Sequence, residues 1–226
     1  MDELRIVRAG VVPYDEAARV QRALEGARQA GEIADTLLFV EHDPVYTKGR
    51  RSEPAHLPMG EDWYRMQGIE VEETDRGGQV TYHGPGQLVG YPIMLIDDVI
   101  AYVRTMEQAL IAALADEQVE AEIRKGLTGV WVEDRKIGSI GVHVSRGVTT
   151  HGFAINVDND LQPFEWIVPC GIENVRMTSL YKETARLDHM KCFRKRVAWR
   201  FAEAYGLRQR LVSLERLLGA PVASAA

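Results

Sequence analysis

The chain has 226 residues, of which 46% are hydrophobic and 27% are charged, and its formal net charge is -6. These values are typical of a soluble globular protein with one substantial core. The negative charge argues against a general nucleic-acid binder, which needs a basic surface to displace counterions. No segment approaches the ~20 apolar residues of a membrane span, and the opening residues lack the apolar stretch of a signal peptide. We therefore expect a cytoplasmic protein that binds neither nucleic acid nor membrane.

The first part of the chain predicts strands and one helix. The apolar pattern indicates a strand over residues 6–12 and a helix over residues 15–30. The apolar run at 36–40 indicates a strand that is buried on both faces. Residues 45–51 are expected to lead into an irregular segment. A further strand is predicted over residues 69–73, directly before a glycine-rich stretch.

A helix is predicted over residues 98–116, where Asp97 or Asp98 can cap the first turn. Its core face is predicted from apolar residues that recur at helical spacing, namely Val99, Val103, Met106, Leu110 and Leu114. Residues 129–157 then predict a small antiparallel sheet, whose first hairpin turns at Asp134 and Arg135.

A last long helix is predicted over about residues 188–205, with Phe193, Val197 and Phe201 on one face. Together these elements predict a single domain of residues 1–226 and of the α/β (α+β) class, with mixed β-sheets covered by helices on one side. Its motif-bearing core spans about residues 36–180.

Residues 76–93, RGGQVTYHGPGQLVGYPI, combine five glycines and two prolines within eighteen positions. Glycine is used where the backbone needs a positive φ or where a ligand approaches it closely, so this stretch predicts a ligand-lining loop. The alternative is a glycine-rich turn between two core strands. The glycine spacing differs from the dinucleotide-binding fingerprint, and a strand, not a helix, is predicted to follow.

Cys170 stands between Pro169 and Gly171, a context that predicts a loop and not a core strand. A free thiol has a pKa of about 8.5 and becomes a good nucleophile near neutral pH only beside a cation or a base. The backbone N–H of Gly171 could then stabilise a developing oxyanion. The alternative for an isolated cysteine is a buried, inert side chain, and Cys192 on the last predicted helix fits that description.

Two kinds of partner could activate Cys170. A Cys–His pair could use His83 or His151, whereas Lys136, at the start of a glycine-interrupted strand, could lower the thiol pKa by its charge. A metal enzyme is not expected, because the sequence has neither H-E-x-x-H nor a C-x-x-C pair.

Three segments in order, residues 76–93, KIGSIGVHVSRGVTTHGFAINV at 136–157 and IVPCGIENVRMTSL at 167–180, closely resemble the octanoyltransferases of lipoate biosynthesis. This family shares a superfamily and an α/β fold with the biotin and lipoate protein ligases. The resemblance implies transfer of octanoyl from the phosphopantetheine of acyl carrier protein to a lysine on a lipoyl domain. The implied acceptors are the 2-oxoacid dehydrogenases and the glycine cleavage H protein. No further cofactor and no metal is implied, and we expect a monomer.

The resemblance also implies roles for individual residues. Cys170 would carry the acyl group as a thioester, and Lys136 would be its acid/base partner. The acyl-binding walls would be formed by Arg76, Gly77, Gly78, Gln79, Val80, Thr81, Tyr82, His83, Ser139, Ile140, Gly141, Gly152, Phe153 and Ala154. Because both protein partners are expected to be acidic, the docking rim is predicted to use Lys48, Arg50, Arg51, Arg146 and Arg176.

Three alternatives remain open on the sequence. An ATP-dependent lipoate or biotin ligase would activate its acid as an adenylate and would not need a nucleophilic cysteine. An amidotransferase that moves octanoyl between lipoylated proteins would also use a cysteine and would differ only in its donor. A non-enzymatic binding module would tolerate Cys170→Ser without loss of function.

Overall fold

Runs of strands separated by a few helices make up the computed structural model, which describes residues 2–172, 175–187 and 189–219. The strands are β1 (Glu3–Val11), β2 (Thr36–Glu41), β3 (Val45–Lys48), β4 (Glu70–Glu73), β5 (Val80–His83), β6 (Gln87–Ile93), β7 (Glu122–Arg124), β8 (Leu127–Val132), β9 (Arg135–Ser145), β10 (Val148–Asn156), β11 (Arg176–Met177) and β12 (Arg208–Leu211). The α-helices are α1 (Tyr14–Gln29), α2 (Glu61–Met66), α3 (Val99–Ala115), α4 (Leu180–Thr184), α5 (Met190–Ala204) and α6 (Leu214–Leu218). Short 3-10 turns lie at Pro54–His56, Gln162–Trp166 and Pro169–Gly171.

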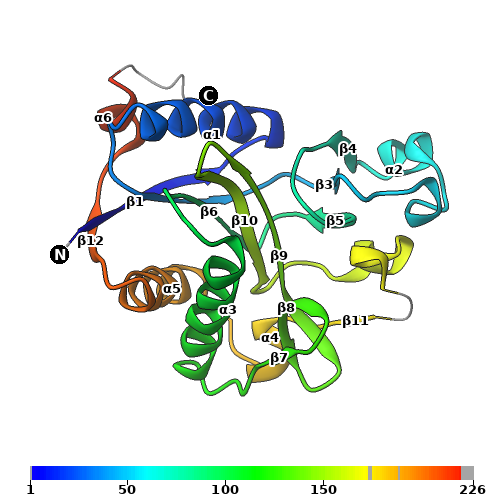
Figure 1. Ribbon diagram of the computed structural model, residues 1–226. Coiled ribbons are helices and arrows are strands. Elements are labelled where there is room, and N and C mark those ends of the chain that lie inside the picture. The colour runs from blue at the N-terminus through cyan, green and yellow to red at the C-terminus, as the bar shows by residue number, and fades with distance from the viewer. Residues whose placement is uncertain (1, 173–174, 188, 220–226) are drawn as a thin grey trace.

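Two mixed sheets organise the described residues (Figure 1). The larger has the order β12-β1-β2-β6-β10-β9-β8-β7, and β11 pairs with the start of β9. In this sheet β1 runs parallel to both of its neighbours, whereas the ladders from β2 to β7 are antiparallel. The smaller sheet has the order β4-β3-β5 and lies beside α2. This arrangement confirms the α/β class with mixed sheets.

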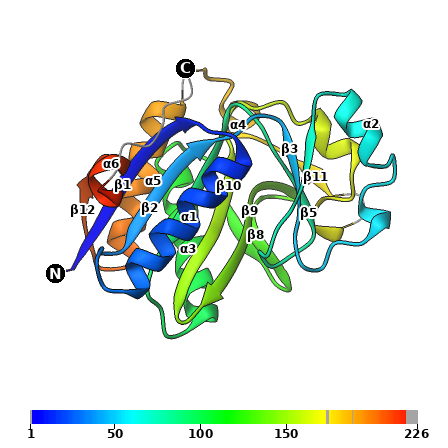
Figure 2. The same cartoon turned by 90° about the horizontal axis from the view of Figure 1, so that it is seen from above.

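Helices cover both faces of the larger sheet, so the expectation that they cover only one side was wrong. Figures 1 and 2 show α1 on one face and α3 with α5 on the other. The reason lies in strands such as β2, which are apolar on both sides. Leu38 and Val40 pack in the cluster beneath α1, whereas Leu37 and Phe39 pack in the cluster beneath α3 and α5.

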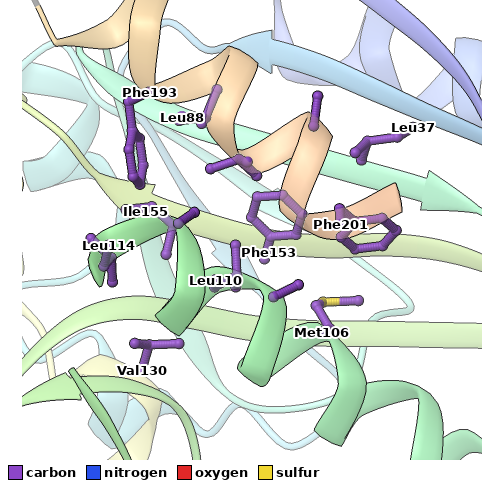
Figure 3. Close-up of a cluster of buried hydrophobic side chains, with 14 of the residues drawn as sticks. Leu37, Leu88, Met106, Leu110, Leu114, Val130, Phe153, Ile155, Phe193 and Phe201 are labelled. Carbon is purple, nitrogen blue, oxygen red and sulfur yellow. The ribbon is translucent and has the colours of Figure 1, made fainter. Parts of the chain in front are cut away.

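The core between α3, α5 and the sheet confirms the predicted helix faces (Figure 3). Met106, Leu110 and Leu114 of α3 are fully buried, as are Phe193 and Phe201 of α5. Burying each of these side chains stabilises the fold by about 1.5–3 kcal/mol relative to exposing it.

At the start of α3, the predicted cap is confirmed but the predicted burial of Val99 is not. The Asp98 side chain caps the helix, accepting hydrogen bonds from the backbone N–H groups of Ile100 and Ala101. Val99, however, is 44% exposed and not part of the core, since it is the first residue of the helix and burial begins at Tyr102.

Several predicted boundaries change in the structure. Val45–Lys48, which was expected only to lead into an irregular segment, is a strand that pairs with both β4 and β5. The hairpin turns at Glu133 and Asp134, since β9 begins at Arg135. Residues 129–157 belong to the larger sheet and do not form a sheet of their own. The predicted start of the last helix, at residue 188, lies outside the described residues.

Candidate active site

Cys170 sits in a tight turn, Pro169–Gly171, and is half-buried. Its φ of 56° is in the left-handed region, which residues other than glycine adopt uncommonly. The turn is closed by the N–H of Gly171, which donates to the carbonyl of Val168 at 3.2 Å. The Gly171 N–H is therefore already engaged, which contradicts its expected role as a free oxyanion donor.

Lys136 is placed by backbone pairing on both sides. In β9 it lies opposite Trp131 of β8 and Met177 of β11, and its carbonyl accepts the N–H of Thr178 at 3.0 Å. Its side chain is only 2% exposed, and the Nζ atom lies 5.7 Å from the centre of the Trp131 ring. Because lysine is seldom buried without a partner, this placement calls for a partner inside the protein.

That partner is Cys170. The Nζ of Lys136 donates a hydrogen bond to Sγ of Cys170 at 3.1 Å, and Oγ of Ser139 lies 3.9 Å from the same sulfur. Burial raises the pKa of the Cys170 thiol, but the charge and hydrogen bond of Lys136, with smaller effects of Arg76 and Ser139, hold the pKa below its ordinary value. The thiolate is thus favoured by an ammonium at contact distance.

The histidines that could have paired with Cys170 are engaged elsewhere. Nδ1 of His83 lies 2.7 Å from the side-chain oxygen of Gln87, and its Nε2 lies 3.4 Å from Oγ1 of Thr47. Burial lowers the pKa of His83 to about 3, so the ring is neutral. Nε2 of His151 lies 2.6 Å from a carboxylate oxygen of Asp75. The structure thus favours Lys136 over both histidines as the partner of the thiol.

Cys170 and Lys136 open into a cavity of about 470 Å³. Its walls include most of the predicted acyl-binding residues: Arg76, Gly77, Gly78, Gln79, Thr81, His83, Ser139, Ile140, Gly141, Gly152, Phe153 and Ala154. Val80 and Tyr82 are not among the lining residues. Side chains alternate across a strand, so these two point from β5 into a separate core with Tyr46 and Tyr64.

Other parts of the wall carried no local signal in the sequence. Tyr14 comes from α1, Val103 from α3, Gly126 from the turn before β8, and Leu127 and Thr128 from the start of β8. None of them lies within the three motifs, so only the packing of the chain brings them to the cavity.

The predicted docking residues differ in their surroundings. Lys48 forms ion pairs with Glu61 and Glu73, at 2.7 and 2.9 Å. Arg176 pairs with Asp134, and Arg146 donates to the side chain of Gln29. Arg50 and Arg51 are exposed, and Arg51 also lines the cavity.

Three other sequence expectations concern residues or features away from the cavity. Cys192 is exposed on α5, so the expectation that it is buried was wrong. Over the part of the chain that the structure describes, no helix has both the length and the apolar character needed to cross a membrane. Over the same residues, no group of three or more His, Cys, Asp or Glu side chains is arranged to hold a metal ion.

A family model and individual relatives both match most of this chain. Residues 13–202 match the model of the lipoyl protein ligase A/B catalytic domain. The chain is 45% identical over 221 residues to an octanoyltransferase of Solibacter usitatus, with 96% of each chain covered. It is 49% identical over 185 residues to one of Acidothermus cellulolyticus, covering 78% of this chain and 80% of that protein.

Solved structures of low sequence identity share the fold. A lipoate protein ligase of Thermoplasma acidophilum superposes with a TM-score of 0.75 at 19% identity, covering 97% of this chain and 91% of that one. A biotin protein ligase of Aquifex aeolicus gives a TM-score of 0.50 at 13% identity, covering 97% and 72%. Since the family model spans most of the chain and both relatives cover more than three quarters of it at 45% identity or more, this chain belongs to the octanoyltransferases, acyltransferases of the lipoyl protein ligase A/B family.

Proposed function

We propose that the protein moves an octanoyl group from octanoyl-acyl carrier protein to Cys170, and from there to the ε-amine of a lysine on a lipoyl domain. The acceptors would be the lipoyl domains of 2-oxoacid dehydrogenases and the glycine cleavage H protein. The observation that carries the proposal is the 3.1 Å contact between the buried amine of Lys136 and the thiol of Cys170.

The first half-reaction uses this pair as a thiolate and an ammonium. The Cys170 thiolate attacks the carbonyl carbon of the donor thioester, and the tetrahedral adduct collapses with loss of the phosphopantetheine thiolate. That leaving sulfur takes a proton from the Lys136 ammonium and departs as a thiol. The enzyme is left with an octanoyl thioester on Cys170 and a neutral amine on Lys136.

The second half-reaction restores the starting state. The neutral ε-amine of the acceptor lysine attacks the Cys170 thioester, and Lys136 takes the proton that this amine must lose. Collapse then forms the amide and releases Cys170 as a thiolate beside the Lys136 ammonium. Thioester exchange is nearly isoenergetic and amide formation is favourable, so the cycle needs no ATP.

The cavity suits the acyl chain. Its volume of about 470 Å³ is within the range usual for small-molecule sites. Gly141, Phe153 and Ala154 form part of the wall of the same cavity that Cys170 lines. Each methylene buried there would stabilise binding by roughly 0.8 kcal/mol.

An ATP-dependent ligase is the main rival, because a solved lipoate-protein ligase A bound with ATP has a similar fold, with a TM-score of 0.73 at 18% identity. A ligase of that kind has no need for a thiol activated by a buried amine, which is the feature that favours transfer through Cys170. An amidotransferase would use the same pair and would differ in its donor.

The test is intact mass spectrometry after incubation with octanoyl-acyl carrier protein in the absence of ATP. The wild-type chain should gain one octanoyl group, and Cys170→Ala should gain none. Lys136→Ala should be acylated about 10²–10⁴-fold more slowly, because the leaving thiolate loses its proton donor and Cys170 loses its counter-charge. Acylation of Lys136→Ala at the wild-type rate would contradict the proposed role of the lysine. Labelling that requires ATP, or that occurs only from an octanoylated lipoyl domain, would favour one of the rivals.

A further inference from the structure

Glu107 is a fully buried carboxylate on the core face of α3, between Met106 and Leu110 in the chain. Its Oε1 accepts the backbone N–H of Gly129 at 2.9 Å, and its Oε2 accepts from the guanidinium of Arg104 at 2.5 Å. Burying a carboxylate is costly unless its charge is paired and its oxygens are hydrogen-bonded. Both conditions are met here, and the hydrogen bond from Gly129 joins α3 to the start of β8.

Gly129 borders the slot that holds the Lys136 side chain. Its φ is +126°, and a Cβ at this position would lie 2.8 Å from Cε of Lys136 and 2.5 Å from the carbonyl oxygen of Gly138. Only glycine leaves room for the lysine stem here. The pairing of β8 with β9 shifts register between Val130 and Trp131, one residue beyond Gly129.

We propose that Glu107 is a positioning residue for Lys136. A lysine side chain has four rotatable bonds, so its Nζ reaches Sγ of Cys170 only if the stem is confined along its length. Two walls from β8 confine it: Gly129 lies against Cε, and the ring of Trp131 has its centre 5.7 Å from Nζ. The hydrogen bond from Gly129 to Glu107 holds the first of these walls in place.

Loss of the Glu107 acceptor leaves the buried N–H of Gly129 without a partner. We expect the backbone around Gly129 to move so that this N–H reaches another acceptor. That movement displaces one wall of the slot that holds the Lys136 side chain. The ammonium then spends less time beside Cys170, and the pKa of the thiol rises because the opposing effect of burial remains.

A purely structural role for Glu107 would have a different signature. It would lower the stability of the packing between α3 and β8 but leave the Cys170 thiol unchanged in molecules that are folded. The pH profile of thiol alkylation separates the two, since it reports the Lys136–Cys170 contact and not the amount of folded protein.

The experiment measures iodoacetamide alkylation of Cys170 against pH in the Cys192→Ser background, because Cys192 is exposed and would react as well. Glu107→Ala should shift the midpoint of the profile upward by about 0.5–1 pH unit, as expected when a thiol loses a neighbouring cation. Glu107→Gln keeps an acceptor oxygen for Gly129 and should stay close to the parent profile. The aspartate side chain of Glu107→Asp is too short to reach Gly129, so this variant should behave like Glu107→Ala. It provides the test of the positioning role if the alanine variant does not fold.

The matched control is Glu117→Gln, which alters another buried glutamate just beyond α3. Its carboxylate contacts Arg196 and His189, at 2.7 and 3.5 Å, and not β8. This control should lower the melting temperature and leave the alkylation profile unchanged. If Glu107→Ala or Glu107→Asp also lowers only the melting temperature, the positioning role is wrong. The inference rests on the proposed pairing of Lys136 with Cys170. Alkylation needs no acyl donor, so a negative result for Glu107 can be told apart from a failure of octanoyl transfer.

Discussion

Lys136 and Cys170 are 34 residues apart in the chain, and their reactivity depends on what surrounds each of them. The lysine is buried against Trp131, whereas the cysteine is half-buried in a turn that opens to the cavity. This difference fits the proposed roles. A group that only moves protons can remain inside the wall, but a group that accepts an acyl chain must be reached by the donor.

Two buried histidines near the cavity predict a dependence of stability on pH. Burial lowers the pKa of His42 to about 4 and of His83 to about 3, from about 6.5 in the unfolded chain. At a pH below 6.5 but above the lowered pKa of each histidine, the unfolded chain binds a proton there and the folded protein does not. The free energy of unfolding therefore falls as the pH drops below 6.5. Each histidine contributes up to about 1.4 kcal/mol per pH unit.

Urea denaturation between about pH 5 and 6.5 checks this, with His42→Gln as the comparison. The variant loses one of the two titrations, so its stability should depend less steeply on pH than that of the wild-type protein. Equal slopes would show that His42 binds protons alike in the folded and unfolded states, so that burial does not lower its pKa.

At the scale of the element, glycine has opposite effects in a central strand and in a surface helix. In β6, a Cβ at Gly90 would lie 2.2 Å from the ring of Phe153, a side chain at the centre of the core. In α1, a Cβ at Gly26 would have no heavy atom of another residue within 4 Å. The same amino acid therefore provides space in β6 and only costs backbone entropy in α1.

The substitutions Gly90→Ala and Gly26→Ala should accordingly change stability in opposite directions. We expect Gly90→Ala to lower the free energy of unfolding by about 1–3 kcal/mol, because the Phe153 ring must move. Gly26→Ala should raise it by about 0.5–1 kcal/mol, because alanine loses less entropy in a helix. Thermal or chemical unfolding of the two variants measures both effects, and a change of the same sign in both would contradict this interpretation.

At the scale of the whole molecule, a chain of net charge -6 is proposed to bind acidic protein partners. Exposed basic residues near the active site offer a way to do so. Arg51 is exposed and lines the cavity, whereas Arg176 already forms an ion pair with Asp134. Arg51 is therefore the better candidate for contact with an acidic carrier.

Charge reversal tests this difference. Arg51→Glu should raise KM for octanoyl-acyl carrier protein by about tenfold at low salt, and the effect should shrink as salt screens the interaction. Arg176→Glu, the matched control, should change KM much less. Initial rates measured across a salt series give both values. Turnover that is independent of salt in the wild-type protein would argue against an electrostatic docking rim.

Much of the architecture followed from local patterns in the sequence. Apolar periodicity located β1, α1, β2 and the core face of α3, since a helix or strand buries side chains at a spacing that can be counted along the chain. The motifs around Lys136 and Cys170 carried the resemblance to the family because they are contiguous. A signal for Glu107 was also present, as a lone carboxylate four residues after Val103 on an apolar helical face.

The tertiary structure decided what depends on distances between remote segments. It favoured Lys136 over His83 and His151 as the partner of Cys170, and it engaged the Gly171 N–H within the turn. It directed Tyr82 away from the cavity and brought Tyr14 into it. A sequence determines which side chains can pack or react, but contact energies fall off within a few ångströms, so only the packed chain determines which of those side chains meet.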